Sequence, residues 1–521
     1  MKYFILKSTR VLFALLIFIP LLLFLIDFTD ILPDKFHRLA HIQLIPAILG
    51  GSAGILITLA LLTLLFGRIY CSVICPLGVF QDIIAWFTKR GKKKNKKKKK
   101  RWYHYHKPYN IVRYSLLAIC VVFLIIGITT PLLFLDPYSN FGRIAVNIFR
   151  PIAMEGNNLF NWIALKFDNY SLYHVTIYTV TTASFIFSFL ALLTVGIMSL
   201  LRGRLFCNTI CPVGSFLGLL SKYALFRIII DPEKCIQCGL CEKSCKAECI
   251  NTSDKSVDYT RCVDCFNCLS RCNKHHAIDY NFAYSKGKQK KEKSEAVKVD
   301  HNKRNFLITS AAIFGTAPLV ASCKKLAAPI DPTKLTPITP PGSLNLVRFK
   351  EKCTACHLCV THCPQQILKP AGFNFGLNYV FKPHMVFYEK GFCNYNCTVC
   401  SEVCPNGAIL PLTEEEKKTT QVGIAKFEEN LCIVITENTS CGACSEHCPT
   451  QAVKMEPYKD GLTLPHVYED ICIGCGGCES ICPVRPVKAI NVLANETHKK
   501  AQLPPEEEIE VIDVEELDFG F

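Results

Sequence analysis

Sixteen cysteines between residues 353 and 482 constrain this chain more than any other feature. They fall into four groups, each ending in Cys-Pro. The first and fourth follow C-x2-C-x2-C-x3-C-P without a mismatch, a bacterial [4Fe-4S] spacing in which three close thiolates hold one cluster and the fourth reaches a partner cluster. The expected ligands are Cys353, Cys356, Cys359, Cys363, Cys393, Cys397, Cys400, Cys404, Cys432, Cys441, Cys444, Cys448, Cys472, Cys475, Cys478 and Cys482.

Two other roles for these cysteines explain the pattern less well. Zinc ribbons are built from two Cys pairs and do not need a Pro-flanked fourth cysteine in every group. A disulfide scaffold typically belongs to a short secreted domain and has no reason to repeat this spacing. The cysteine pattern therefore favours iron–sulfur ligation.

Hydropathy and charge point to a membrane. The length of 521 residues predicts two to four domains. The mean hydropathy of +0.24 is high for a soluble protein, and the apolar residues are concentrated in the first 205 positions. The net charge of +16 comes largely from two lysine-rich blocks beside apolar segments. Basic residues so placed usually reflect membrane topology rather than nucleic-acid binding.

Four apolar stretches meet or approach the roughly 20 residues that span a bilayer. They are residues 11–26, 42–66, 111–135 and 175–201. The first lacks a small-residue cleavage site and is interpreted as an uncleaved helix. Residues 89–107 carry twelve Lys or Arg and no acid. The positive-inside rule therefore places the N-terminus, this loop and the chain after Leu201 in the cytoplasm of a bacterium, with the protein in its inner membrane.

The membrane part contains an internal repeat, because residues 67–80 match residues 203–216. Both copies read G-R-x-[YF]-C-x2-I-C-P-x-G-x-F and carry the cysteines Cys71, Cys75, Cys207 and Cys211. Cysteines at i and i+4 share a helix face, and a pseudo-two-fold axis would gather all four thiols. They would then ligate a further cluster or act as two dithiols. The proline after each second cysteine does not by itself imply a cubane, which slightly favours the dithiols. The alternative is that all four are buried packing residues before a helix-ending proline.

A shorter cysteine-rich module follows the fourth stretch. Its two groups have the spacing C-x2-C-x2-C-x3-C without a terminal proline and predict two more clusters, on the cytoplasmic side. The expected ligands are Cys235, Cys238, Cys241, Cys245, Cys262, Cys265, Cys268 and Cys272. Cys249 is a spare whose spacing fits less well than that of Cys245, and Cys120 in the third stretch is expected to serve packing.

Residues 286–304 form a basic linker, and residues 305–323 form an apolar run. Its 17 residues from 306 to 322 would make a helix of about 25 Å, which is marginal for a fifth span. The run would carry the following chain outward as a span or signal anchor; a buried soluble helix is the alternative. Residues 319–323 resemble a lipoprotein processing box, so Cys323 is a lipidation candidate.

The expected fold is mixed. A four-helix transmembrane part with an internal duplication occupies residues 1–223, and an α+β ferredoxin-like module occupies 224–285. After the linker and the apolar run, a Pro-rich spacer at 324–345 leads to a four-cluster domain at 346–495. An acidic tail at 496–521 is expected to be solvated or to dock a basic redox partner.

These motifs carry a family resemblance. The repeats and the two-cluster module resemble the NapH-type membrane ferredoxins, which share them with NosR and CcoG proteins. The basic-Phe-Leu leader at 303–307 and the four cysteine groups resemble NapG-type periplasmic ferredoxins. The resemblance covers roughly residues 1–490 and implies a NapH and NapG fusion that passes electrons from quinol toward a periplasmic reductase, notably nitrate reductase.

The resemblance also implies how the four groups exchange their last cysteines. In similar ferredoxins the first group exchanges with the fourth, and the second with the third. The sequence departs from the pattern of these families in two places. Cys432 lies nine positions before Cys441, and Lys303-Arg304 stands where a twin arginine is expected. The first concerns that group's first ligand, and the second concerns the export route.

Clusters on both sides of a membrane need a connection, because the hydrocarbon core is about 30 Å thick. Menaquinol or ubiquinol is the expected carrier. Candidate groups for its protons are His37, His41, Asp136, Asp168 and His174 at the predicted outer face. Ordinary interfacial polar residues are the alternative reading of these five.

Two functions follow. The first is an electron-transfer subunit with six [4Fe-4S] clusters, or seven with the membrane cysteines, that accepts electrons from quinol or a cytoplasmic donor and feeds a periplasmic reductase or cytochrome c. The second is a redox maturation factor for a periplasmic or copper enzyme. No G-x-G-x-x-G follows an expected strand, which argues against a self-contained NAD(P)H oxidoreductase.

Overall fold

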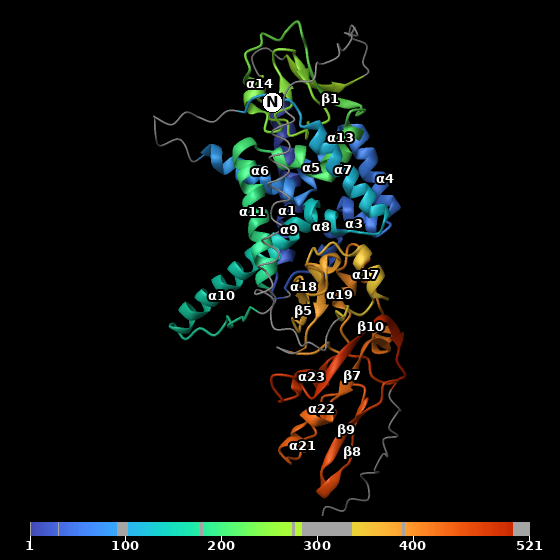
Figure 1. The fold of residues 1–521 in the computed structure, drawn as a ribbon. Helices are drawn as coiled ribbons and strands as arrows, with labels where there is room; N and C mark the ends of the chain where they lie inside the picture. The colour runs from blue at the N-terminus through green and yellow to red at the C-terminus, as the bar shows by residue number, and fades with distance from the viewer. Residues whose placement is uncertain are drawn as a thin grey trace, which may run out of the picture. The chain divides into compact units, whose positions relative to one another are not determined.

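The computed structural model describes residues 2–29, 31–90, 103–177, 181–272, 277–283, 336–387 and 391–503 (Figure 1). The expectations for the linker 286–304, the run 305–323 with Cys323, most of the Pro-rich spacer and the acidic tail lie outside these residues. The chain forms two compact units. Unit 1 comprises residues 1–385 and 399–411, and unit 2 comprises residues 386–398 and 412–521. The sequence predicts a single domain at 346–495. The division between the two units instead falls within the second of the four cysteine groups in the ladder, residues 353–482.

Unit 1 begins with a helical region. Its elements are α1 (Lys2–Ile26), η1 (Asp34–His37), α2 (Arg38–His41), α3 (Leu44–Leu49), α4 (Ala53–Phe66), α5 (Ile69–Val73), α6 (Pro76–Arg90), α7 (Asn110–Ile125), α8 (Thr130–Leu135), α9 (Pro137–Ile144), the π-helical turn η2 (Ala145–Phe149), α10 (Arg150–Leu165), α11 (Thr182–Arg202), α12 (Leu205–Thr209) and α13 (Pro212–Ser221). The two repeats fold alike. In each, a long helix ends at glycine, a five-residue helix carries the first motif cysteine, and the motif proline begins the next helix.

Among the described residues, two helices are long and apolar enough to cross a membrane. They are Tyr3–Ile26, with a mean hydropathy of 2.6, and Thr182–Arg202, with 2.3. They correspond to the first and fourth predicted spans. The other two predicted spans are each divided into shorter helices, so a four-span arrangement is not confirmed.

Glycines account for both breaks. The stretch 42–66 divides into α3 and α4 at Gly50-Gly51, where Gly51 has a φ of 71°. The stretch 111–135 divides into α7 and α8 near Gly127, whose φ is 84°. A positive φ is accessible to glycine at little cost and is incompatible with a continuing right-handed helix.

A small α+β module follows the helices in unit 1. Strand β1 (Phe226–Ile230) pairs antiparallel with β4 (Ile278–Phe282), and β2 (Ile250–Asn251) pairs with β3 (Ser256–Val257). Helix α14 (Leu240–Ser244) lies between β1 and β2 in the chain. This arrangement agrees with the α+β module expected after the fourth stretch.

The first part of the ladder also belongs to unit 1. Its elements are α17 (Leu346–Lys352), α18 (Leu358–Thr361), the β5 (Leu368–Pro370) and β6 (Pro383–Met385) pair, η4 (Leu377–Tyr379) and α19 (Val399–Glu402). Leu133, Ala355, Val380 and Phe381 form one buried cluster, so this part of the ladder shares a core with the helices.

Unit 2 holds the rest of the ladder. Strand β7 (Thr420–Phe427) pairs with β10 (Ile490–Lys500), and β8 (Val453–Pro457) pairs with β9 (Thr463–Val467), both antiparallel. The remaining elements are α20 (Glu414–Lys418), η5 (Glu429–Leu431), α21 (Ile433–Thr436), α22 (Ala443–Glu446), η6 (Lys459–Gly461) and α23 (Gly477–Ile481). The helices of unit 2 are short, and the loops that carry its cysteines lie between these helices and the two strand pairs.

Candidate iron–sulfur sites

One cavity in unit 2 is lined by four cysteines. It has about 380 Å³ of empty space including its open mouth and is lined by Cys432, Cys441, Cys444, Cys482, Phe427, Ile433, Ala443, Pro465, Pro483, Val484, Ala489 and Ile490. Cys432 precedes α21, Cys441 precedes α22, Cys444 lies in α22 and Cys482 follows α23; every other lining residue is apolar. Four thiols in an apolar cavity fit a [4Fe-4S] cluster. The long interval before Cys441 does not keep Cys432 away from the third group.

The cavity corrects the expected exchange of cysteines. Cys482 belongs to the fourth group but lies with the third group. Conversely, burial raises the pKa of Cys478, and the neighbouring Cys475, Cys472 and Cys448 raise it further. The third and fourth groups therefore exchange with each other, and the exchange implied by the resemblance is wrong. Helix α22 packs against α23, and this local contact brings the two groups together.

The first group shows the same rule in unit 1. Burial raises the pKa of Cys359, and so do the neighbouring charges of Cys356, Cys353 and Cys404. Cys404 closes the second group, so the first group exchanges with its neighbour in sequence. Backbone amides support the sulfurs: Ala355 N donates to Cys353 Sγ and Ile409 N to Cys404 Sγ, each over 3.4 Å. Such N–H···S bonds tune iron–sulfur sites.

The module after the second repeat follows this rule too. The pKa of Cys241 is raised to about 12 by burial, with the charges of Cys272, Cys235 and Cys238 adding to it. Cys245 instead lies near Cys268 in the other group. The spare Cys249 is buried, and its sulfur lies 3.5 Å from that of Cys245.

Four of the cysteine loops share one strained backbone conformation. The residues directly before and after the second cysteine have φ values between 46° and 82°, and they are Gln237, Gly239, Asp264, Phe266, Ala355, His357, Gly474 and Gly476. Five of the eight are not glycine, and each such residue costs about 1–3 kcal/mol. Consecutive N–H groups in loops of this kind form a concave anion-binding surface. Apart from the three glycines, no residue type at these positions predicts this conformation.

Among the described residues, no three His, Cys, Asp or Glu side chains converge closely enough to hold one metal ion. In a cubane each thiolate binds a different iron atom, so the sulfurs are spread more widely than around a single ion.

The two repeats bring their cysteines together. Burial raises the pKa of Cys211, and the charges of Cys207, Cys75 and Cys71 raise it further. The pseudo-two-fold relation extends to the backbone. Arg68 of the first repeat donates to the Cys207 carbonyl over 3.3 Å, and Arg204 of the second donates to the Cys71 carbonyl over 2.7 Å.

A glycine in each repeat permits this crossing of arginines. A Cβ at Gly78 would collide with the Cys71 carbonyl and approach Arg204 Nη1 to 2.6 Å. A Cβ at Gly214 would collide with the Cys207 carbonyl and approach Arg68 Nη2 to 2.7 Å. The G in C-P-x-G is therefore a packing requirement, which the motif alone did not explain.

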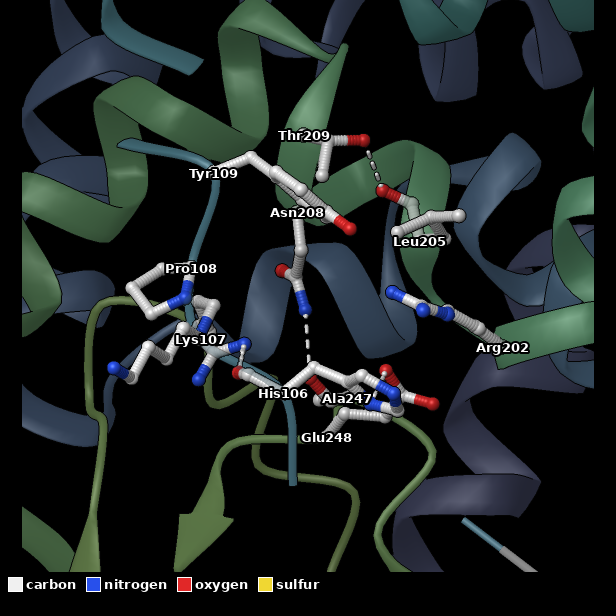
Figure 2. Close-up of a pocket in the computed structure, with 11 residues that line it drawn as sticks. His106, Lys107, Pro108, Tyr109, Arg202, Leu205, Asn208, Thr209, Ala247 and Glu248 are labelled. Atoms are coloured by element: carbon white, nitrogen blue, oxygen red, sulfur yellow. Dashed lines mark hydrogen bonds and ion pairs between the residues drawn. The ribbon is translucent and has the colours of Figure 1, made fainter. Parts of the chain in front are cut away.

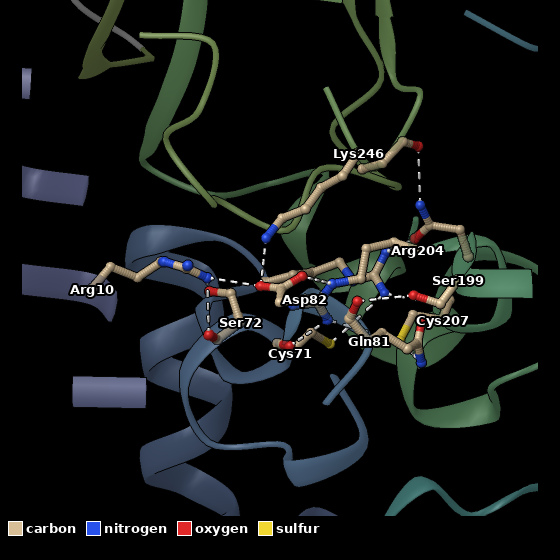
Figure 3. Close-up of polar contacts among 12 residues, drawn as sticks. Arg10, Cys71, Ser72, Gln81, Asp82, Ser199, Arg204, Cys207 and Lys246 are labelled. Carbon is tan, nitrogen blue, oxygen red and sulfur yellow. Dashed lines mark hydrogen bonds and ion pairs between the residues drawn. The ribbon is translucent and has the colours of Figure 1, made fainter. Parts of the chain in front are cut away.

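Positive charge exceeds negative charge beside these four cysteines. Asp82 binds Arg10 over 3.1 Å, Arg204 over 2.7 Å and Lys246, and it joins α1, both repeats and the module (Figure 3). Burial alone would raise the pKa of Asp82, but Arg204, Lys246 and Arg10 hold it well below its usual range. Three cations thus share one carboxylate. A buried charge needs a partner, and an anionic four-thiolate centre beside Arg204 would supply the missing negative charge.

A second pocket lies where the module meets the second repeat (Figure 2). It has about 310 Å³ of empty space including its open mouth. Within it, His106 Nδ1 lies 3.0 Å from Glu248, and Asn208 Nδ2 donates to the Ala247 carbonyl over 3.2 Å. None of its eleven lining residues is a cysteine, so this pocket offers no thiol to a cluster.

The five proposed proton acceptors do not form one site. His37 and His41 are neighbours, with ring centroids 5.5 Å apart. Asp136 is buried and accepts hydrogen bonds from Ser139 as the N-cap of α9. Asp168 and His174 are exposed on the segment after α10. Cys120 is buried, in accord with a packing role.

Comparisons with known proteins agree on the cofactor class. Models described as 4Fe-4S binding domains match residues 50–96 and 184–231, residues 226–247 and residues 346–369, and a 4Fe-4S dicluster domain matches residues 439–486. The first of these covers both membrane repeats. No solved structure matches the chain.

Three relatives cover different parts of the chain. The uncharacterised protein MJ0749 of Methanocaldococcus jannaschii is 32% identical over 95 residues, which are 18% of this chain and 38% of that protein. Ferredoxin-type protein NapG of Escherichia coli is 28% identical over 190 residues, 35% of this chain and 81% of NapG. The methylamine utilization ferredoxin-type protein MauM of Methylobacillus flagellatus is 30% identical over 145 residues, 27% of this chain and 61% of MauM. The chain is an iron–sulfur protein of the ferredoxin type, and it is built from several 4Fe-4S binding domains. Ferredoxin-type proteins of this kind transfer electrons.

Proposed function

We propose that this chain is a membrane-bound electron-transfer protein that connects redox reactions on the two sides of a bacterial inner membrane. Electrons enter from menaquinol, ubiquinol or a cytoplasmic donor and leave through the cysteine ladder to a periplasmic reductase such as nitrate reductase, or to a cytochrome c. The similarity to NapG and the resemblance of the membrane part to NapH-type proteins support this role.

A single observation carries the proposal: two cysteine-rich parts contact opposite ends of the same helix. Near the start of α1, Tyr3 donates to Asp279 of the module over 2.7 Å. Near its end, the Leu25 carbonyl accepts from Thr361 of the ladder over 3.3 Å. These 22 residues of helix span about 33 Å, close to the thickness of the hydrocarbon core.

Helix α11 repeats this arrangement. At its beginning, Thr181 contacts the Pro370 carbonyl of the ladder over 3.4 Å. Beyond its end, Arg204 N donates to the Lys246 carbonyl of the module over 3.0 Å. Both helices also expose large apolar side chains, among them Leu12, Leu16, Phe189 and Leu193. Extended apolar surface of this kind is suited to lipid.

The four repeat cysteines would be the connection between the bilayer and the module clusters. Lys246 and Thr260 of the module contact the repeats through Asp82 and Arg68. On the ladder side, Tyr70 lies near both Cys75 and Asp136. Ser139 Oγ, which donates to Asp136, also lies 2.8 Å from Thr354 Oγ1. Packed residues thus run from the module through the four cysteines to the first ladder group.

A seventh [4Fe-4S] cluster fits the four membrane cysteines better than two dithiols. Four thiolates, two buried arginines and the match of a 4Fe-4S binding domain to both repeats support it. The protein part of the mechanism is then to hold the sulfurs, to exclude water from them and to balance their charge. A bound cluster supplies one-electron chemistry.

Two experiments test the proposal. Reporter fusions after Asn281 and after Glu496 should report opposite compartments; two cytoplasmic signals would contradict the two-sided arrangement. Purified protein in lipid should have its clusters reduced by a menaquinol analogue. A fully iron-loaded protein that no quinol reduces would favour the second candidate, a NosR-like or CcoG-like redox maturation factor.

A further inference from the structure

Buried lysines recur beside the cluster cysteines. Among the described residues, the lysines with less than a tenth of their surface exposed are Lys246, Lys369, Lys382, Lys417 and Lys488. Lysine is almost never fully buried unless its charge is paired. Three of these five lie in the ladder beside a predicted ligand, and each lies beside a different cysteine group.

Lys382 lies beside the first group and is 1% exposed. Its ammonium donates to Thr129 Oγ1 over 3.1 Å and to the Lys350 carbonyl. Thr129 lies 3.4 Å from the Cys353 carbonyl, so the lysine is anchored at the cluster loop. Both hydrogen-bond acceptors of the ammonium are uncharged. Burial lowers the pKa of Lys382 to about 8, and the nearby Cys353 thiolate opposes this lowering and favours the protonated form.

Lys417 and Lys488 repeat this placement in unit 2. Lys417 is 3% exposed and donates to the Cys393 sulfur. Lys488 is fully buried and donates to the Cys482 carbonyl and, over 3.3 Å, to the Ser480 carbonyl. Cys482 lines the four-cysteine cavity, so this charge lies against the cluster held there.

A fixed positive charge beside a cluster favours its reduced form. Reduction adds one negative charge to the cluster, and net charge and hydrogen bonding set the potential at which this happens. Residues outside the ligand shell act on such centres through their charge and hydrogen bonds. In a water-poor interior the attraction is stronger than at the surface.

We propose that Lys382, Lys417 and Lys488 are positioning residues that raise the reduction potentials of the first, second and third ladder clusters. They would keep these clusters reducible by a weak donor such as quinol. The inference rests on the clusters of the proposed function and adds that the chain sets their potentials individually.

The test is a redox titration with dithionite and mediators, followed by electron paramagnetic resonance on the full-length protein. Lys488→Met removes the charge and keeps most of the side-chain volume. One electron equivalent should move to lower potential, and the ratio of reduced to oxidised cluster at the parent's midpoint should fall by about tenfold. Lys382→Met and Lys417→Met should each move a different single equivalent.

Two controls separate charge from structure. Lys488→Arg keeps the charge and should retain the parent curve, and Lys426→Met removes a lysine that is 64% exposed and should move nothing. Unchanged potentials in iron-replete Met variants would overturn the proposal. If all three Met variants instead lose iron, the lysines serve assembly and the proposal is also overturned. A parent without iron would contradict the proposed function itself.

Discussion

The two repeats are alike at their cysteines and differ six residues after the last one. At matching positions the first repeat has Gln81 and Asp82, and the second has Leu217 and Gly218. Asp82 gathers three cations. Gly218 instead leaves room for the buried Arg113, whose guanidinium donates to the Thr260 carbonyl over 2.5 Å.

This comparison separates two requirements. The parts that hold the sulfurs are duplicated: cysteines, crossed arginines and close-packed glycines. Two of the contacts that attach the module are not duplicated: Asp82 pairs with Lys246, and Arg113, which packs at Gly218, donates to the Thr260 carbonyl. A symmetric centre is thus built into an asymmetric protein.

The largest expected effect is loss of the symmetric centre. Replacing Cys75 or Cys211 by Ser preserves size but removes a thiolate that binds iron. Either change should lower the iron content by about four per chain, from about 28 to about 24. Iron and acid-labile sulfide analysis checks this. Equal iron in variant and parent would show that the four cysteines are packing residues, and unequal losses at the two sites would break the symmetry argument.

Removing the charge of Asp82 should have the next largest effect. Asp82→Asn leaves Arg10, Arg204 and Lys246 without their carboxylate, and breaking a buried ion pair typically costs about 3–5 kcal/mol. Because the pKa of Asp82 is held below its usual range, its contribution is present at neutral pH and is lost only as the pH falls through that lowered pKa. Thermal unfolding at neutral pH measures the loss. A midpoint equal to the parent's would contradict the network in Figure 3.

The paired glycines give a direct comparison of the two repeats. Gly78→Ala and Gly214→Ala each place a methyl group against a cysteine carbonyl and a crossing arginine, at a cost of about 1–3 kcal/mol. The two costs should agree, and denaturation curves measure them. Gly196→Ala is the matched control, since nothing lies within 4 Å of the added carbon. A neutral effect at one motif glycine alone would mean that the repeats are packed differently.

The smallest effect is expected at Gln81. Its Nε2 donates to Cys207 Sγ over 3.3 Å, and the matching Leu217 makes no such bond in the second repeat. Gln81→Leu makes the repeats alike and removes a bond worth about 1 kcal/mol. The midpoint potential of the membrane centre should fall slightly with iron content unchanged. A rise in the midpoint potential would contradict the hydrogen bond that Gln81 donates to the Cys207 sulfur.

Much of the site was predictable from spacing, whereas its pairing was not. The spacing identified the loops around Cys353 and Cys472, and the repeat predicted that Cys71 and Cys207 would meet. Nothing in the spacing says which groups exchange, because a fold contact between α22 and α23 decides it. Long apolar stretches likewise predicted helices, but Gly50-Gly51 and Gly127 each divide one of these stretches into two helices. The buried lysines escaped prediction because burial is a tertiary property.

The most direct test of the central claim is electron transfer through the four membrane cysteines. Protein in lipid vesicles is mixed rapidly with a menaquinol analogue, and reduction of the Cys235–Cys272 module clusters is followed spectroscopically in the parent and in Cys75→Ser/Cys211→Ser. The variant should keep its other six clusters, and its module clusters should no longer respond to quinol. Equally fast reduction of these clusters in both proteins would contradict it.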